Sequence, residues 1–74
     1  INYQLSKNSH IKIEVYDMMG KLIKTLVNEF QSPGYRSIKW NGKNFENQKV
    51  SSGVYFYSLQ SESFSATKKM ILLD

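Results

Sequence analysis

Ile-Lys-Ile-Glu-Val-Tyr, the stretch at residues 11–16, alternates apolar and polar side chains without a break. Because successive side chains of a β-strand point to opposite faces, this period of two predicts a strand with one buried face. Asp17 and Gly20 follow at once. These residue types favour tight turns, since Asp bonds to the backbone ahead of it and Gly tolerates positive φ. We therefore predict that the chain turns there and returns as a second strand over residues 21–27.

The most β-prone run of the chain lies further on, at residues 54–59, and reads Val-Tyr-Phe-Tyr-Ser-Leu. β-Branched and aromatic residues of this kind are enriched in strands. Since the run is apolar on both faces at its start, we expect a central strand that is covered on each side. Three further strands are predicted around it, at residues 1–5, after Pro33-Gly34 with Ile38 and Trp40 on one face, and at residues 64–74. Residues 41–48 are polar and predict a loop.

No segment shows the period of an amphipathic helix, because each apolar run lies close to a turn signal. The fold class that follows is all-β, with six or seven short antiparallel strands in a sandwich or a small barrel. The 74 residues suffice for a single domain, residues 1–74. A chain of this length buries only about 60% of the surface that its unfolded form exposes, so we expect a thin core.

The composition argues against several classes of function. The net charge of +4 comes from basic residues spread along the chain, with Lys68-Lys69 as the only adjacent pair. The basic clusters typical of nucleic-acid binding are therefore missing, and we expect no nucleic-acid partner. No apolar run approaches the roughly 18 residues of a membrane helix, so no membrane span is expected. The chain contains no cysteine, which rules out disulfides and thiolate metal sites.

Candidate catalytic and metal-ligating residues are few. His10 is the only histidine and is predicted to lie in a turn just before a strand, with no Gly-x-Ser-x-Gly motif in the chain. The loop at residues 41–48 supplies several Asn and Glu oxygens, but their spacing differs from that of an EF-hand and is typical of turns. We predict no catalytic residue, no metal ligand and no cofactor, and a protein that is not an enzyme.

Several short words stand in a particular order and spacing along the whole chain. They are Val15-Tyr16-Asp17 with Gly20, Thr25-Leu26-Val27-Asn28, Pro33-Gly34, Trp40-Asn41-Gly42, Ser52-Gly53-Val54-Tyr55-Phe56-Tyr57 and Thr67-Lys68-Lys69-Met70-Ile71-Leu72-Leu73. Together they resemble the C-terminal sorting domain of the type IX (Por) secretion system. The words up to the Gly-Val-Tyr-Phe-Tyr strand are also similar to the immunoglobulin-like domain of flagellar hook-capping proteins. The terminal Lys-Lys-Met-Ile-Leu-Leu favours the sorting domain.

The resemblance implies an immunoglobulin-like β-sandwich at the C-terminal end of a larger secreted protein. An outer-membrane type IX translocon would recognise it in the periplasm, and a sortase-like peptidase would remove it. The upstream cargo in the same chain would then reach the outer-membrane surface or the medium. By motif match, the residues that carry recognition would be Gly53, Tyr55, Lys68, Lys69, Met70, Ile71, Leu72 and Leu73. A terminal strand at a sheet edge would also offer unpaired backbone groups to a partner.

Two features depart from the sorting-domain pattern. The family's usual Asn-Pro-Phe-Asn-Pro-like opening is missing before Ile1, from which we expect a truncation, and its Trp-Asp-Gly word is Trp40-Asn41-Gly42 here. The alternative function is a structural or adhesive immunoglobulin-like module, as in hook-capping proteins. A carbohydrate-binding module would instead present exposed aromatic side chains such as Tyr35 or Trp40 on one face, and burial of Trp40 would count against it.

Overall fold

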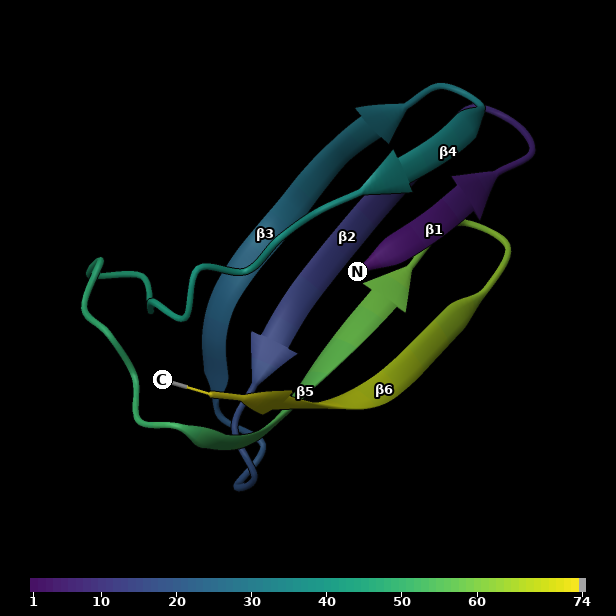
Figure 1. Ribbon diagram of the computed structural model, residues 1–74. Helices are drawn as coiled ribbons and strands as arrows, with labels where there is room; N and C mark the ends of the chain where they lie inside the picture. Colours follow the sequence, from purple (N-terminus) through teal and green to yellow (C-terminus); the bar gives the residue numbers. More distant parts are fainter. Residues whose placement is uncertain (74) are drawn as a thin grey trace.

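The computed structural model describes residues 1–73, and all of its regular structure is β. The strands, labelled in Figure 1, are β1 (Asn2–Leu5), β2 (Ser9–Tyr16), β3 (Leu22–Gln31), β4 (Gly34–Ser37), β5 (Gly53–Gln60) and β6 (Ser65–Leu72). The predicted all-β class and strand number are confirmed. Asp74, with which the predicted last strand ended, lies outside the described residues. Within residues 1–73, no helix is long and apolar enough to cross a membrane.

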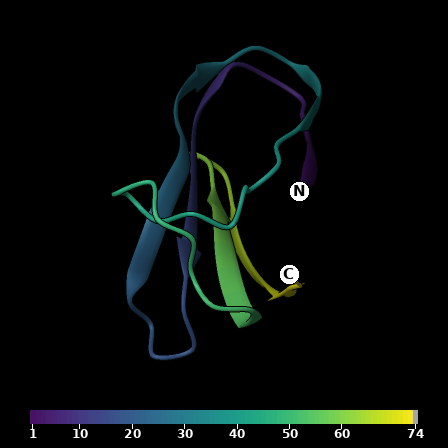
Figure 2. The same ribbon diagram turned by 60° about the vertical axis from the view of Figure 1, so that its left-hand side comes forward.

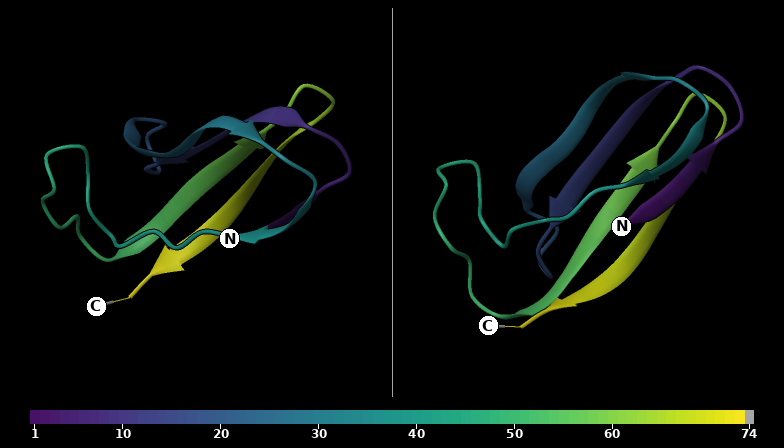
Figure 3. Two further views of the ribbon diagram at one scale, coloured as in Figure 1. Left: turned by 90° about the horizontal axis from the view of Figure 1, so that it is seen from above. Right: turned by 45° about the horizontal axis from the view of Figure 1, so that its top comes forward.

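The strands form two antiparallel sheets. Four of them make the larger sheet in the order β3-β2-β5-β6, and β1 pairs with β4 in a two-stranded sheet. The smaller sheet lies on one face of the larger one, as Figures 1 and 3 show. Two sheets that pack face to face make a sandwich, so the expected immunoglobulin-like architecture is confirmed. The sandwich is asymmetric, because two short strands cover part of four longer ones.

The core lies between the sheets and is built around β2. Ile11, Ile13 and Val15 are fully buried and share the inner face of this strand, as their alternation predicted. Tyr3 and Leu5 of β1 pack against Ile11 and Ile13 from the smaller sheet. Because each strand offers only a few inward-facing side chains, the core is thin, as expected for a chain of this length.

The turn from β2 to β3 follows the prediction from Asp17 and Gly20. The Asp17 carboxylate accepts hydrogen bonds from the backbone N–H groups of Met19 and Lys21, both at 2.9 Å, and Gly20 adopts φ of 84°. The returning strand β3 is longer than predicted, since it extends to Gln31. Its pairing with β2 shifts register twice, which marks bulges along the edge of the sheet.

The strand predicted to contain Ile38 and Trp40 ends earlier than expected, because β4 stops at Ser37. Two backbone hydrogen bonds continue its pairing to Ile1 and Ile38, at 3.0 and 2.9 Å, and the pairing with β1 ends there. Trp40 instead packs its ring against Tyr55 in the larger sheet, with ring centroids 5.0 Å apart. The chain then forms the expected loop, which swings beyond β3 before it returns to β5 (Figures 1 and 2).

The strand β5 is central, as predicted, because it pairs with β2 on one side and β6 on the other. The expectation that it is covered on both faces is wrong. On the inner face, Leu59 packs in the core with Tyr3 and Leu5 of the smaller sheet, and Tyr55 is buried against Trp40. Val54 and Phe56 are half-buried on the outer face. No described strand covers that face, since the only second layer is the β1–β4 pair. Within residues 1–73, Val54 and Phe56 are shielded from solvent only by neighbouring side chains of the same sheet.

Candidate recognition site

The residues predicted to carry recognition come from two segments that the fold brings side by side. β5 and β6 are neighbours, and their register places Gly53 opposite Leu72 and Tyr55 opposite Met70. This register runs without a shift from one end of the pair to the other. The sequence words at residues 52–57 and 67–73 are therefore one structural unit, at the β6 edge of the larger sheet (Figure 1). Their role in recognition remains a prediction.

Some of these residues hold the fold together. The Tyr55 side chain is buried, and its hydroxyl donates a hydrogen bond to the Ser51 carbonyl oxygen at 2.7 Å. The Trp40 ring lies edge-on against it, and the Trp40 indole N–H donates to the Lys43 carbonyl oxygen at 2.9 Å. A hydrogen bond and an aromatic contact of this kind position the β4–β5 connection against the sheet. The Tyr55 side chain thus makes contacts within the domain and is not exposed to a partner.

The end of β6 is anchored by a close contact with the same connection. Gly42 has φ of 75°, and a Cβ atom placed on it would lie 3.3 Å from Leu72 Cδ1. Glycine therefore suits both the backbone conformation and the space under Leu72. Met70, opposite Tyr55, is half-buried on the same face. Met70 and Leu72 therefore lie on the face of β6 that is turned towards the rest of the domain.

Of the other predicted residues, Gly53 is half-buried and four are open to solvent. Lys68 and Lys69 are exposed, while Ile71 is 64% and Leu73 is 80% exposed. Adjacent strand residues point to opposite faces, so Lys68 lies beside Tyr57 on one face and Lys69 beside Phe56 on the other. Neither lysine forms an ion pair with any of residues 1–73. Within these residues, Lys12 and Glu14 form an ion pair at 3.7 Å. The middle of β6 therefore carries uncompensated positive charge.

A small hollow of about 160 Å³ flanks the open side of β6. It lies where the end of β6 approaches the start of β1 and the segment after β4. Its lining is mainly apolar and consists of Ile1, Lys39, Trp40, Met70, Ile71 and Leu72. Sequence reasoning missed the contribution of Ile1, because its proximity to β6 depends on how the two sheets stack.

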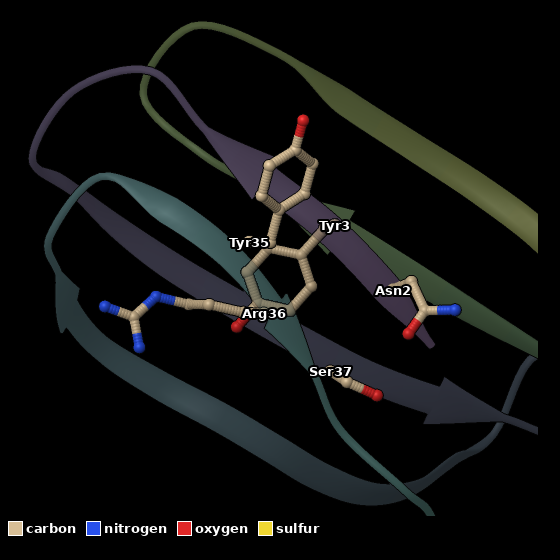
Figure 4. A pocket seen from close by; sticks show the side chains of 5 residues that line it. All are labelled: Asn2, Tyr3, Tyr35, Arg36 and Ser37. Carbon is tan, nitrogen blue, oxygen red and sulfur yellow. The ribbon is translucent and has the colours of Figure 1, made fainter.

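A larger and shallower hollow of about 470 Å³ lies at the β1–β4 pair. Figure 4 shows the five side chains that line it, those of Asn2, Tyr3, Tyr35, Arg36 and Ser37. Tyr35 is 84% exposed, whereas the Arg36 guanidinium donates to the carbonyl and hydroxyl oxygens of Ser32 at 3.1 and 3.0 Å. Since Trp40 is half-buried against Tyr55, Tyr35 and Trp40 do not form one exposed aromatic face. That arrangement counts against the carbohydrate-binding alternative.

The histidine on the outer face of the larger sheet contacts an amide and an aromatic side chain of β3. His10 lies within β2 rather than in a preceding turn, because Ser9 and His10 already pair with β3. Its Nε2 is 2.6 Å from the Asn28 side-chain oxygen, and its ring lies edge-on to Phe30. No carboxylate or nucleophilic side chain is bonded to it among the described residues.

Glu14 and Tyr16 form a second pair on the same face. The Tyr16 hydroxyl donates to the Glu14 carboxylate at 2.9 Å, and Glu14 is buried. This hydrogen bond first, and then desolvation and the negative charge of Glu14, raise the pKa of Tyr16 above 10.0. A hydrogen bond from Ser58 acts in the opposite direction. The hydrogen bond between Tyr16 and Glu14 therefore stabilises the sheet while the Tyr16 hydroxyl keeps its proton.

The side-chain oxygens of Asn41 and Asn44, in the loop at residues 41–48, accept backbone hydrogen bonds that stabilise turns, as predicted. The Asn44 side-chain oxygen accepts hydrogen bonds from the backbone N–H groups of Glu46 and Gln48 at 2.9 and 3.1 Å. The Asn41 side-chain oxygen accepts one from the Lys43 N–H at 3.1 Å. Across residues 1–73, no three His, Asp or Glu side chains gather in a way that could hold a metal ion.

A comparison with known protein families gives a match that covers the first five strands and ends at the first residue of β6. A family model described as the FlgD Ig-like domain matches residues 1–65. Neither the curated proteins nor the solved structures give a match. The match supports the hook-capping side of the resemblance, ends where β6 begins, and leaves the sorting-domain reading a prediction. Because the matched segment spans most of the 74 residues, the chain belongs to the FlgD Ig-like domain family.

Proposed function

We propose that this chain is a non-catalytic structural module that serves a larger protein assembly through its surface. The observation that carries the proposal is the family match over residues 1–65. The geometry agrees with it, because the side chains that chemistry would need are engaged in turns and strand pairs. The two hollows described above are open to solvent, and most of the surface that they expose is apolar. Such a surface suits contact with another protein better than enclosure of a substrate.

A second candidate is the C-terminal secretion signal of the type IX system. The observation that favours it is the pairing of the two words that carry the resemblance. This pairing places Lys68, Lys69 and Ile71 on an open edge strand, opposite residues 54–57 of β5. In this proposal an outer-membrane translocon binds the domain in the periplasm. A sortase-like peptidase then removes it, and an upstream cargo reaches the cell surface or the medium. The family match does not extend over this edge.

One experiment separates the two candidates. The chain is fused to the C-terminus of a reporter that carries a periplasmic leader, and the fusion is expressed in a host with the type IX machinery and in a matched host without it. A structural module leaves the reporter in the periplasm of both hosts. A secretion signal delivers it to the surface or medium only where the machinery is present.

Two variants locate any signal that the fusion reveals. The charge reversal Lys68→Glu with Lys69→Glu is expected to abolish export if β6 is read, since it changes exposed side chains that make no internal ion pair. The matched control, Lys7→Glu with Lys21→Glu, makes the same change in net charge at exposed positions in turns and should be exported normally. Retention of the wild-type fusion in the periplasm of both hosts would contradict the second candidate, and its export would contradict the first. Export of the β6 variant at the wild-type level would show that Lys68 and Lys69 are not read.

A further inference from the structure

We propose that the outer edge of β6 binds an extended segment of a partner protein, which adds to the larger sheet as a fifth strand and carries two adjacent acidic residues. The inference rests on the proposed function as a protein-docking module and deepens it by naming the surface and the chemistry of the partner. It applies under either candidate function, because both require a contact with another protein.

The first argument is the backbone of β6. This strand pairs only with β5 and ends the larger sheet. In an antiparallel pair, alternate residues direct their N–H and C=O groups to the neighbour and the others direct them away. No other residue of 1–73 forms a backbone hydrogen bond to Ser65–Leu72 from the open side. An edge of this kind is a template for the addition of a strand.

The second argument is that the other sheet edges are poorer templates. β3 shifts register twice against β2, and the β4–β5 connection runs beside it, with Lys24 Nζ 5.8 Å from the Phe45 ring centre. Bulges and covering loops both discourage pairing at an edge. β1 and β4 have four residues each, whereas β6 has eight in unbroken register. The longest regular edge among the described strands is therefore that of β6.

The third argument is charge. Lys68 and Lys69 lie at the middle of β6, the strand contains no acidic residue, and neither lysine has an ion-pair partner in residues 1–73. Antiparallel pairing of two β6 strands about their centres would bring Lys68 opposite Lys68, or Lys69 opposite Lys69, of the other copy. Like charges opposite each other destabilise a sheet, so a second copy is disfavoured. An acidic partner strand is favoured for the same reason.

The position of the lysines also predicts the pattern of the partner. Because Lys68 and Lys69 point to opposite faces, a complementary strand needs two consecutive acidic residues to meet both. Apolar residues should flank them on the side of Ile71, which is 64% exposed and lines the hollow beside Trp40. The partner is thus an extended segment in which an acidic pair adjoins apolar, β-prone residues.

The experiment uses the full chain and a synthetic peptide of eight residues, the length of β6. The peptide holds two adjacent glutamates at its centre, flanked by valine, isoleucine and threonine. Amide hydrogen exchange, followed residue by residue by NMR, is expected to show new protection at alternate residues of β6 when the peptide is added. Two further peptides carry N-methyl groups on odd or on even residues. Strand addition requires that one set abolishes binding and the other leaves it largely intact, because only alternate N–H groups face the protein.

Charge reversal tests the side-chain part of the proposal. Lys68→Glu with Lys69→Glu is expected to weaken binding of the glutamate peptide by about tenfold, since two favourable pairs become repulsive. A peptide with two lysines in place of the glutamates should restore binding to this variant. The control Lys7→Glu with Lys21→Glu, equal in net charge, should change the affinity by less than about threefold, because charges in distant turns are screened.

Several outcomes would overturn the proposal. These are no protection of β6 at saturating peptide, equal loss with both N-methylated peptides, or equal weakening by the control variant. A concentration-dependent dimer with protected β6 amides would show that a second copy occupies the edge. Protection at the hollow formed by Tyr3 and Tyr35 would place the docking surface elsewhere. That last result would not contradict the proposed function as a docking module. The reporter fusion tests the proposed function independently of the peptide.

Discussion

The strands β2 and β6 have the same length, belong to the same sheet and contain the same number of apolar residues, yet they differ in almost every structural respect. Each has eight residues, of which four are apolar. Five residues of β2 are buried, and none of β6 is. In β2 the apolar side chains alternate, so that three of them fall on the inner face and fill the core. In β6 three of the four are consecutive, at residues 70–72, so that both faces receive some. Pattern and position, rather than composition, decide which strand stabilises the fold and which is left to bind.

The largest test of this difference is the removal of the same side chain from each strand. Ile13→Ala should lower the free energy of unfolding by about 2–5 kcal/mol, because Ile13 is fully buried at the centre of the core. Ile71→Ala should cost less than about 0.5 kcal/mol, because Ile71 is largely exposed. Urea unfolding followed by fluorescence or circular dichroism measures both. Equal losses would show that β6 supports the core as much as β2 does.

A smaller effect is expected where β6 is anchored. Gly42→Ala should destabilise the domain by about 2 kcal/mol, since the new methyl group meets both an unfavourable positive φ and the Leu72 side chain. Gly20→Ala is the matched control, because Gly20 also has positive φ but nothing lies within 4 Å of its added Cβ. It should cost only the backbone strain of about 1 kcal/mol. If the two variants unfold at the same urea concentration, the Leu72 contact contributes nothing.

The pH dependence of stability probes the outer face of β2. Tyr16 has a pKa above 10.0 in the folded protein, so the folded state holds its proton more tightly than the unfolded state does. Its contribution is fully present below pH 10.0 and is lost as the pH rises through the raised pKa. Tyr16→Phe should therefore lose less stability than wild type across that alkaline range. Parallel stability curves for the two proteins would contradict the assigned hydrogen bond to Glu14.

The smallest effect on stability is expected from the lysines of β6. Lys68→Ala with Lys69→Ala should change the free energy of unfolding by less than about 0.5 kcal/mol, because both side chains are exposed and unpaired within residues 1–73. The same variant should self-associate more readily, since the charges that oppose edge-to-edge pairing are gone. Sedimentation velocity over a range of concentrations measures this. A variant that stays as monomeric as wild type would show that the lysines do not protect the edge.

The sequence predicted those parts of the fold that depend on local pattern. The alternation of Ile11, Ile13 and Val15 identified the inner face of β2, and Asp17 with Gly20 identified the turn that follows. It also brought together the two words at residues 52–57 and 67–73 as a single candidate site, although it could not show that they are cross-strand partners. Strand register depends on which segments meet, and no short window of sequence contains that information.

The predictions that were wrong concern contacts between segments far apart. Trp40 was assigned to a strand because it shares an alternating pattern with Ile38, but it packs on Tyr55 across the sandwich. Val54 and Phe56 suggested a strand covered on both faces, but the smaller sheet lies on one face alone. The hollow that involves Tyr3 and Arg36 has no sequence signal, since it exists only where β1 and β4 pair.

By itself, then, the sequence determined an all-β, cysteine-free domain with a thin core, and it marked Lys68-Lys69 and the apolar residues after them as unusual. The all-β class, the absence of cysteine and the thin core follow from length, composition and periods of two, which act along a few neighbouring residues. The apolar residues after Lys69 stand out only through the resemblance to a sorting domain. Only the tertiary structure decided that the smaller sheet covers one face of the larger one, that β6 is an open edge and that its lysines have no partner in residues 1–73. The physical reason is that burial and pairing are properties of neighbours in space, and those neighbours are set by sheet order.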